Sequence, residues 1–270
     1  MSQTKPNLET KRHAAPHSSG GAATRALILG GTGEARRFAA RIAGDPRIDA
    51  IISLAGRTSE PLEQSLPARV GGFGGVQGLI HYLEDERIDK VVDATHPFAA
   101  RMSSNARQAC AALNIPLIAL SRAPWSPLDD DRWIDAADNA AAVAALGAAP
   151  RRVFLTTGRL GLADFLLTPQ HFYLIRTIDR PPPADLPPHH ELILDRGPFT
   201  VESELSLMRD AHIDVIVSKN SGGGATYAKI AAARELRIEV VMIAPPRRED
   251  VETVHDIEQA LAFLLERRAA

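Results

Sequence analysis

Residues Leu27–Ala35 read LILGGTGEA, in which an apolar strand runs into a glycine-rich turn and then into the start of a helix. Glycines let backbone N–H groups approach a phosphate closely, and the N-terminus of a helix supplies positive partial charge. The spacing is close to the dinucleotide-binding fingerprint, although its third glycine is replaced. A tight strand-to-helix turn without a ligand is the alternative, and the strand before the turn favours nucleotide binding. The predicted cofactor-binding residues of this turn are Gly30, Gly31, Thr32, Gly33, Glu34 and Ala35.

Along the rest of the chain, short apolar runs alternate with amphipathic stretches, which is typical of parallel sheets with crossover helices. The predicted strands are 25–29, 49–54, 68–70, 90–93, 116–120, 152–156, 172–177, 191–194, 214–217 and 239–243. The predicted helices are 34–43, 76–85, 98–113, 136–146, 160–167, 200–211, 226–236 and 254–267. We expect an α/β fold in which each half of the chain buries its own, mainly parallel sheet. The predicted parts are a flexible tail over 1–24, a nucleotide-binding domain over 25–148 and a second α/β domain over 149–270.

Composition and charge narrow the function classes. The 270-residue chain is 45% hydrophobic and carries 31 Lys and Arg against 33 Asp and Glu, for a formal net charge of −2. That balance argues against a nucleic-acid binder, whose phosphate contacts need a basic excess, but it leaves room for a local basic pocket. The sole cysteine, Cys110, excludes an intramolecular disulfide and a multi-cysteine metal site, so no metal is predicted. Without a secretory signal or an apolar run of membrane length, we expect a cytoplasmic protein that binds no membrane.

The end of the second predicted strand indicates which nucleotide would bind. In NAD-binding proteins that strand commonly ends in Asp or Glu, which accepts hydrogen bonds from the ribose 2′-hydroxyl. Here the strand is followed by Ala55-Gly56-Arg57-Thr58, so Arg57 and Thr58 stand where a 2′-phosphate would lie. An arginine and a hydroxyl in place of a carboxylate favour NADPH over NADH. The alternative for Arg57 is a solvated loop charge.

Two further segments follow predicted strands, at the edge where parallel sheets bind ligands. After the third strand, residues 71–75 read GGFGG, a loop into which a flat ligand can press or one that only connects. Its predicted cofactor-binding residues are Gly72, Phe73 and Gly74. After the fourth strand, residues 93–98 read DATHPF, in which Thr95 and His96 are positioned to touch a cofactor or a substrate.

In the second half, residues 156–159 (TTGR) and 218–226 (SKNSGGGAT) each end a strand and open a helix, as anion-binding turns do. The second segment lacks the order of glycines and lysine of a P-loop, so an ATPase is not predicted. Its lysine and serine among glycines suit carboxylates or cofactor phosphates. The chain contains no Gly-x-Ser-x-Gly elbow, paired-histidine zinc motif or Cys-x-x-Cys, which weakens hydrolase and metalloenzyme interpretations.

The motifs LILGGTGEAR, SLAGRT, RVGGFGG, VVDATHPFA, TTGR and SKNSGGG occur in this order. Together they resemble the precorrin-6A reductase family of cobalamin biosynthesis, which includes a cobalt-precorrin counterpart. The resemblance runs from about Arg25 to the final predicted helix. It implies two Rossmann-like domains with the ligands in the cleft between them. It also implies NADPH-dependent reduction of one double bond of precorrin-6A to give precorrin-6B.

A macrocycle rich in carboxylates needs scattered cations and amide donors more than a basic surface. The predicted substrate-binding residues are His96, Arg101, Gly158, Arg159, Lys219, Asn220 and Ser221, with Arg176 and Arg180 in or near the same cleft. The expected partner is therefore precorrin-6A as an anionic small molecule. A monomer can hold the whole of this site.

Reduction of a conjugated double bond needs a hydride on one carbon and a proton on its neighbour. Asp93 and His96 are the nearest candidates for a catalytic acid, because both follow a strand at the expected ligand edge. Asp93 can instead brace the turn, and a lone histidine is more often a hydrogen-bonded structural residue. We expect hydride positioning to be the enzyme's main contribution, with no dedicated acid.

Two other functions stay open. A different NADPH-dependent reductase or epimerase often carries Tyr-x-x-x-Lys, a pair that none of the three tyrosines forms. A nucleotide-sensing module without catalysis is the second alternative. The glycine-rich turns of the second half favour a second ligand, and hence catalysis, over sensing.

Overall fold

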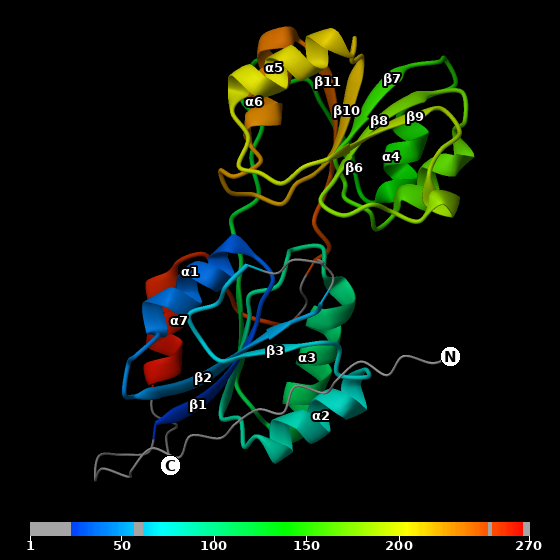
Figure 1. Ribbon diagram of the computed structural model, residues 1–270. Helices are drawn as coiled ribbons and strands as arrows, with labels where there is room; N and C mark the ends of the chain where they lie inside the picture. Colours follow the sequence, from blue (N-terminus) through cyan, green and yellow to red (C-terminus); the bar gives the residue numbers. More distant parts are fainter. Residues whose placement is uncertain (1–22, 57–61, 248–249, 267–270) are drawn as a thin grey trace.

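The protein folds into two α/β domains, one above the other in Figure 1, in a computed structural model that describes residues 23–56, 62–247 and 250–266. The strands of the lower domain are β1 (Thr24–Leu29), β2 (Ile48–Leu54), β3 (Ala68–Val70), β4 (Lys90–Asp93), β5 (Leu117–Leu120) and β12 (Thr253–Val254). Its helices are α1 (Gly33–Ile42), α2 (Val76–Asp85), α3 (Ala100–Leu113) and α7 (Ile257–Leu265). The sheet order is β12-β5-β4-β1-β2-β3, and every neighbouring pair is parallel.

The upper domain repeats this architecture. Its strands are β6 (Trp133–Ala136), β7 (Arg152–Leu155), β8 (Phe172–Thr177), β9 (His190–Leu194), β10 (Val215–Lys219) and β11 (Glu239–Ile243). Its helices are α4 (Asn139–Ala145), α5 (Val201–Asp210) and α6 (Ala228–Leu236), with 3-10 turns η1 (Leu162–Leu167) and η2 (Pro183–Asp185). The order β6-β11-β10-β7-β8-β9 is again entirely parallel. The predicted α/β fold with two parallel sheets is therefore confirmed.

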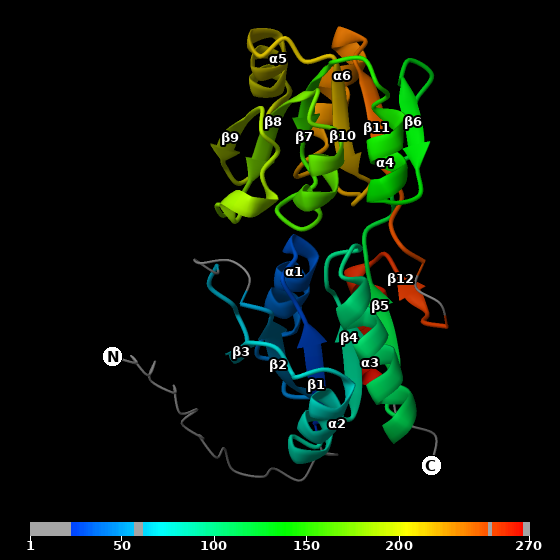
Figure 2. The ribbon, with the colours of Figure 1, turned by 90° about the vertical axis from the view of Figure 1, so that its right-hand side faces the viewer.

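The structure corrects the predicted domain boundary near residues 147–150, because the upper domain is inserted between β5 and β12 of the lower one. β6 comes before that boundary in the chain, yet it pairs with β11 in the upper sheet. β12 comes near the end of the chain, yet it pairs with β5 in the lower sheet, and α7 packs there too (Figure 2). The chain thus crosses between the domains twice, once between β5 and β6 and once between β11 and β12.

The central strand β1 explains why this sequence forms a sheet covered on both faces. Neighbouring residues of a strand point to opposite faces, so a sheet buried on both sides needs a continuous apolar run. In β1, Ile28 packs in one cluster with residues of α1 and α7, whereas Leu27 and Leu29 pack in another with α2 and α3. Figure 1 shows the two pairs of helices on opposite sides of the sheet.

The structure describes only the last two residues of the predicted tail over 1–24. Most of the predicted tail, residues 1–22, lies outside the described residues, whereas Thr24 begins β1. Within the described ranges, none of the helices has the length and apolar character that crossing a membrane requires.

The insertion of the upper domain between two parts of the lower one predicts which piece of the chain folds by itself. A fragment of residues 130–246 keeps all strands of the upper sheet, whereas 149–270 loses β6 and α4 and carries β12 and α7 without their sheet. We expect cooperative thermal unfolding of the first fragment and none of the second, followed by circular dichroism and by binding of a hydrophobic dye. A cooperative transition of 149–270 at the same midpoint would contradict this assignment of β6, β12 and α7 to the two domains.

Candidate functional site

The glycine-rich turn is held against three strands of the lower sheet. Thr32 caps α1, because its Oγ1 accepts a hydrogen bond from the Ala35 N–H at 3.0 Å and donates one to the Ala94 carbonyl at 2.9 Å. A Cβ on Gly30 would lie 2.8 Å from Ile52 Cδ1, so glycine is needed for the turn to pass β2. Gly31 has a φ of +110°, which other residues adopt rarely. The N–H groups of the first turn of α1 are thereby presented at the carboxyl edge of the sheet.

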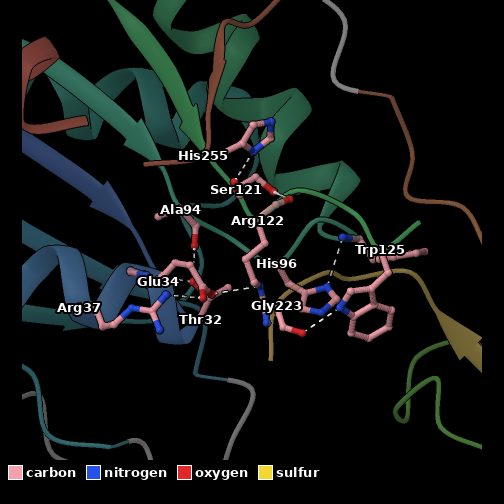
Figure 3. Close-up of polar contacts among 12 residues, drawn as sticks. Thr32, Glu34, Arg37, Ala94, His96, Ser121, Arg122, Trp125, Gly223 and His255 are labelled. Carbon is pink, nitrogen blue, oxygen red and sulfur yellow. Dashed lines mark hydrogen bonds and ion pairs between the residues drawn. The ribbon is translucent and has the colours of Figure 1, made fainter. Parts of the chain in front are cut away.

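Glu34 carries a negative charge into this first turn and is matched by two arginines. Its Oε1 accepts a hydrogen bond from Arg37 Nη2 at 2.9 Å, and its Oε2 lies 3.1 Å from Arg122 Nε (Figure 3). The first turn therefore has one carboxylate and two guanidinium groups, which leaves positive charge for an anion.

The loop after β3 is packed rather than open. The Arg69 guanidinium lies 3.9 Å from the centre of the Phe73 ring, and the Phe73 and Tyr82 rings meet edge to face at 5.1 Å. Arg69 also donates to Ser53 Oγ at 2.8 Å and to the Gly72 carbonyl at 3.1 Å. Burial lowers the pKa of Arg69. Arg69 thus holds the loop of Gly72, Phe73 and Gly74 against the end of β2.

Asp93 lies beneath the turn that follows β4. Its Oδ1 accepts hydrogen bonds from Thr95 N at 3.0 Å and Thr95 Oγ1 at 2.6 Å, and its Oδ2 accepts one from Ser103 Oγ at 2.5 Å. Its exposed fraction is only 2%. This geometry suits the bracing role of Asp93, and it ties Thr95 to the sheet edge beside the glycine-rich turn.

A cavity of about 420 Å³ lies next to this edge and is lined from both domains. The lower domain contributes His96, Phe98 and Ala99, directly after β4. His96 Nδ1 accepts a hydrogen bond from the Phe98 N–H at 3.2 Å, which orients the ring. The upper domain contributes the rest of the lining, including residues 156–160 and 176–179.

Two lysines of the upper domain line the cavity with little access to water. Lys219 donates to the Thr157 carbonyl at 2.8 Å, and its Nζ lies 5.3 Å from the centre of the Phe98 ring. Burial lowers the pKa of Lys219. Lys229 is 4% exposed and donates to the Thr226 carbonyl at 2.8 Å. Burial, with the nearby Arg176 guanidinium as a smaller cause, lowers the pKa of Lys229 to about 7.

Arg176 completes the cationic lining. Its Nη1 lies 2.7 Å from Glu204 Oε1, in an ion pair whose two side chains are almost fully buried. Its guanidinium also stacks 3.7 Å from the centre of the Phe199 ring. Among the described residues, the buried Thr157 and Thr177 hydroxyls of the lining have no hydrogen-bond partner. The lining therefore offers cations and unused donors together.

The structure brings together some of the sequence-predicted substrate residues and separates others. The predicted residues that line the cavity are His96, Gly158, Arg159, Lys219 and Ser221. Arg101, on α3, and Asn220 are absent from that lining; Asn220 instead bonds the backbone of Trp125. Arg57 and Thr58 lie outside the described residues.

Sequence reasoning missed three features of the site. Lys229 is a single cation within an apolar stretch of α6, and that isolation was the available signal. Arg69 stands two residues before the glycine loop, where an inward-facing cation has no motif of its own. Thr177 ends β8, and only the folded sheet places it beside Arg176 in the cavity.

Comparisons with known proteins agree with this architecture. A family model described as Precorrin-6x reductase CbiJ/CobK matches residues 25–265. The chain is 52% identical over 238 residues to a precorrin-6A reductase of Sinorhizobium sp, covering 88% of this chain and 91% of that protein. It is 49% identical over 243 residues to one of Rhodobacter capsulatus, covering 88% and 96%. The solved structure of a CobK precorrin-6A reductase superposes with a TM-score of 0.83 at 47% identity, covering 89% of this chain and 96% of that one.

A cobalt-precorrin-6A reductase of Priestia megaterium is more distant, with 28% identity over 236 residues that cover 83% of this chain and 91% of that protein. The family match spans both sheets, the glycine-rich turn and the whole cavity. The chain belongs to the precorrin-6x reductase CbiJ/CobK family.

Proposed function

We propose that this protein reduces one double bond of precorrin-6A to give precorrin-6B in cobalamin biosynthesis, with NADPH as the hydride donor. One observation carries the proposal: the short segment Ala94–His96 joins the glycine-rich turn to the cation-lined cavity. Its first residue accepts a hydrogen bond from Thr32 at 2.9 Å, and its last lines the cavity. A nucleotide on the turn and a second ligand in the cavity would therefore meet at the end of β4.

The cavity suits a ligand with several carboxylates. Its lining contains two arginines, two lysines and two aspartates: Arg159, Arg176, Lys219, Lys229, Asp179 and Asp195. Charge-assisted hydrogen bonds to carboxylates are stronger than neutral ones, and in a water-poor cavity their strength rises further. The relatives that share about half of this sequence are named for precorrin-6A, whose macrocycle carries such carboxylates.

NADPH is the nucleotide that the first domain suits best. The turn at α1 is suited to the pyrophosphate, and β2 ends without the carboxylate that an NAD ribose needs. Arg69 beside Ser53 supplies a cation at that same strand end, and Arg57 follows directly after Gly56 in the sequence. When bound, NADPH supplies the hydride, and the residues of this chain orient it towards the cavity. The buried, unpaired thiol of Cys110 suits a reducing compartment, so we propose that this activity is cytoplasmic.

The function itself is tested by one assay. We expect the purified protein to oxidise NADPH only when precorrin-6A is present, because the hydride needs an acceptor, and the loss of reduced nicotinamide absorbance measures the rate. The product should gain two hydrogens by mass spectrometry. Turnover of simple carbonyl substrates at a comparable rate would favour the other NADPH-dependent reductases, and NADPH binding without any turnover would favour a nucleotide sensor.

Lys229 predicts a pH dependence of substrate binding. Its pKa of about 7 means that the charged form dominates below that pH and is lost above it. If Lys229 binds a carboxylate, KM for precorrin-6A should rise about tenfold per pH unit above pH 7 until substrate binding no longer depends on this charge. Lys229→Met should show the higher KM at every pH and no such rise. A rise that persists unchanged in Lys229→Met would assign the titration to another group.

The source of the proton is tested by two substitutions. His96 lines the cavity, whereas Asp93 is engaged beneath it, so we expect neither to act as a dedicated acid. In single-turnover experiments at saturating NADPH and substrate, His96→Ala should slow the chemical step less than about tenfold, well below the hundred- to ten-thousandfold typical of a lost acid. A thousandfold slower step with unchanged binding, in His96→Ala or Asp93→Asn, would make that residue the proton donor.

A further inference from the structure

The loop Asn220–Gly224, which follows β10, holds the first linker between the domains, residues 121–132. Asn220 Oδ1 accepts a hydrogen bond from the Trp125 N–H at 2.7 Å, and Asn220 Nδ2 donates to the Trp125 carbonyl at 2.8 Å. The Trp125 indole donates to the Gly223 carbonyl at 2.8 Å (Figure 3). A loop of the upper domain therefore fixes both the backbone and the side chain of the linker at one residue.

The same loop leaves a space that the side chain of Arg122 fills. A Cβ on Gly223 would lie 2.3 Å from Arg122 Cδ, and one on Gly222 would lie 2.1 Å from the Ala123 carbonyl oxygen. Both glycines have positive φ, +66° for Gly222 and +73° for Gly223. The positive φ and the missing side chain at these two glycines therefore leave room for Arg122 to pass.

The Arg122 side chain extends from the linker, past this loop, to the glycine-rich turn of the lower domain. Its Nε lies 3.1 Å from Glu34 Oε2, and the two side chains are only 17% and 13% exposed. That carboxylate oxygen is buried and receives no hydrogen bond from the described residues, so Arg122 is the cation that faces it. Arg37, on the other oxygen, is 66% exposed and therefore largely screened by water.

We propose that Arg122 is a positioning residue of the cofactor site, which acts by neutralising Glu34 at the N-terminus of α1 and is itself held by the Asn220–Gly224 loop. The inference rests on the proposed binding of a dinucleotide at this turn. A buried, uncompensated carboxylate there would repel the pyrophosphate and cancel the attraction of the helix terminus. With Arg122 in place, the phosphates meet a net positive turn, and this condition depends on contacts made by the other domain.

The test measures NADPH binding by titration, with thermal unfolding as a check on folding. We expect Arg122→Met to weaken binding at least about tenfold and Arg37→Met, the matched control on the exposed side of the same carboxylate, less than about threefold. Arg122→Lys, which keeps the charge, should lie between wild type and Arg122→Met. The decisive variant is Glu34→Gln combined with Arg122→Met: without the carboxylate charge, Arg122→Met should cost less than about threefold.

Gly223→Ala gives a second route to the same answer, because its methyl group would collide with the Arg122 side chain and strain a loop residue at positive φ, while every residue of the glycine-rich turn at α1 stays unchanged. We expect weaker NADPH binding, again relieved by Glu34→Gln. Unchanged NADPH binding by Arg122→Met, or an equal loss of binding with and without Glu34→Gln, would overturn the inference. The proposed function would stand in either case, because the wild-type protein would still bind NADPH. A wild-type protein that fails to bind NADPH would instead overturn the proposed function.

Discussion

The path of the chain, which runs from the lower domain into the upper one and back again, is the constraint on which the rest of the structure depends. A domain joined by one linker is free to swing, whereas this chain crosses between its domains twice. The upper domain is formed by one continuous stretch, from β6 to β11, whereas the lower domain needs β12 and α7 from beyond that stretch. The relative placement of the glycine-rich turn and the cavity is therefore tied to both linkers and to the edge strands β6 and β12 that follow them.

The first linker, between β5 and β6, is bound to its surroundings as well as to its strands. His255, just after β12, contacts the Ser121 carbonyl with its Nδ1 at 2.6 Å (Figure 3). Asn220 forms hydrogen bonds with both the N–H and the carbonyl of Trp125. The first linker is thereby fixed near its beginning by the lower domain and a few residues later by the upper one. A site lined from both domains needs such fixed connections, because the hydride transfer proposed for it requires a short distance and a defined orientation.

Local signals in the sequence were enough for most elements, and they failed where an element is defined by its partner. Residues 68–70 and 76–85 were predicted with the observed bounds because five residues, four of them glycine, separate a strand from a helix. β6 was missed because Trp133–Ala136 runs into an alanine-rich helix with only a short turn between them, and β12 because it has two residues. Which sheet an edge strand joins depends on the free edge it meets, and no local pattern records that.

The same limit applies to the site. Thr32 and the glycines around it belong to a local motif and could be singled out as candidates from their order alone. Lys229 sits among alanines on α6 and reads as a solvated helical charge, whereas its burial comes from packing next to Trp125 and close to Arg176. Arg122 has no motif at all: its role follows from a carboxylate 88 positions earlier in the chain and a loop 100 positions later.

Burying the cationic side chains of the cavity costs free energy as long as no anion is bound. This cost indicates which kind of ligand the cavity is suited to bind. Burying a cation removes its hydration, and the lowered pKa of Lys229 is the expression of that penalty. Glu204 forms a close ion pair with Arg176 and also acts on Lys229 as a minor countercharge, but among the described residues neither Lys229 nor Lys219 forms an ion pair with a carboxylate. An anionic ligand supplies the missing countercharge to groups that are already in position, so its binding needs little reorganisation. A formal net charge of −2 is therefore compatible with a polyanionic substrate, because the sign that the substrate meets is set by the few charges buried around it.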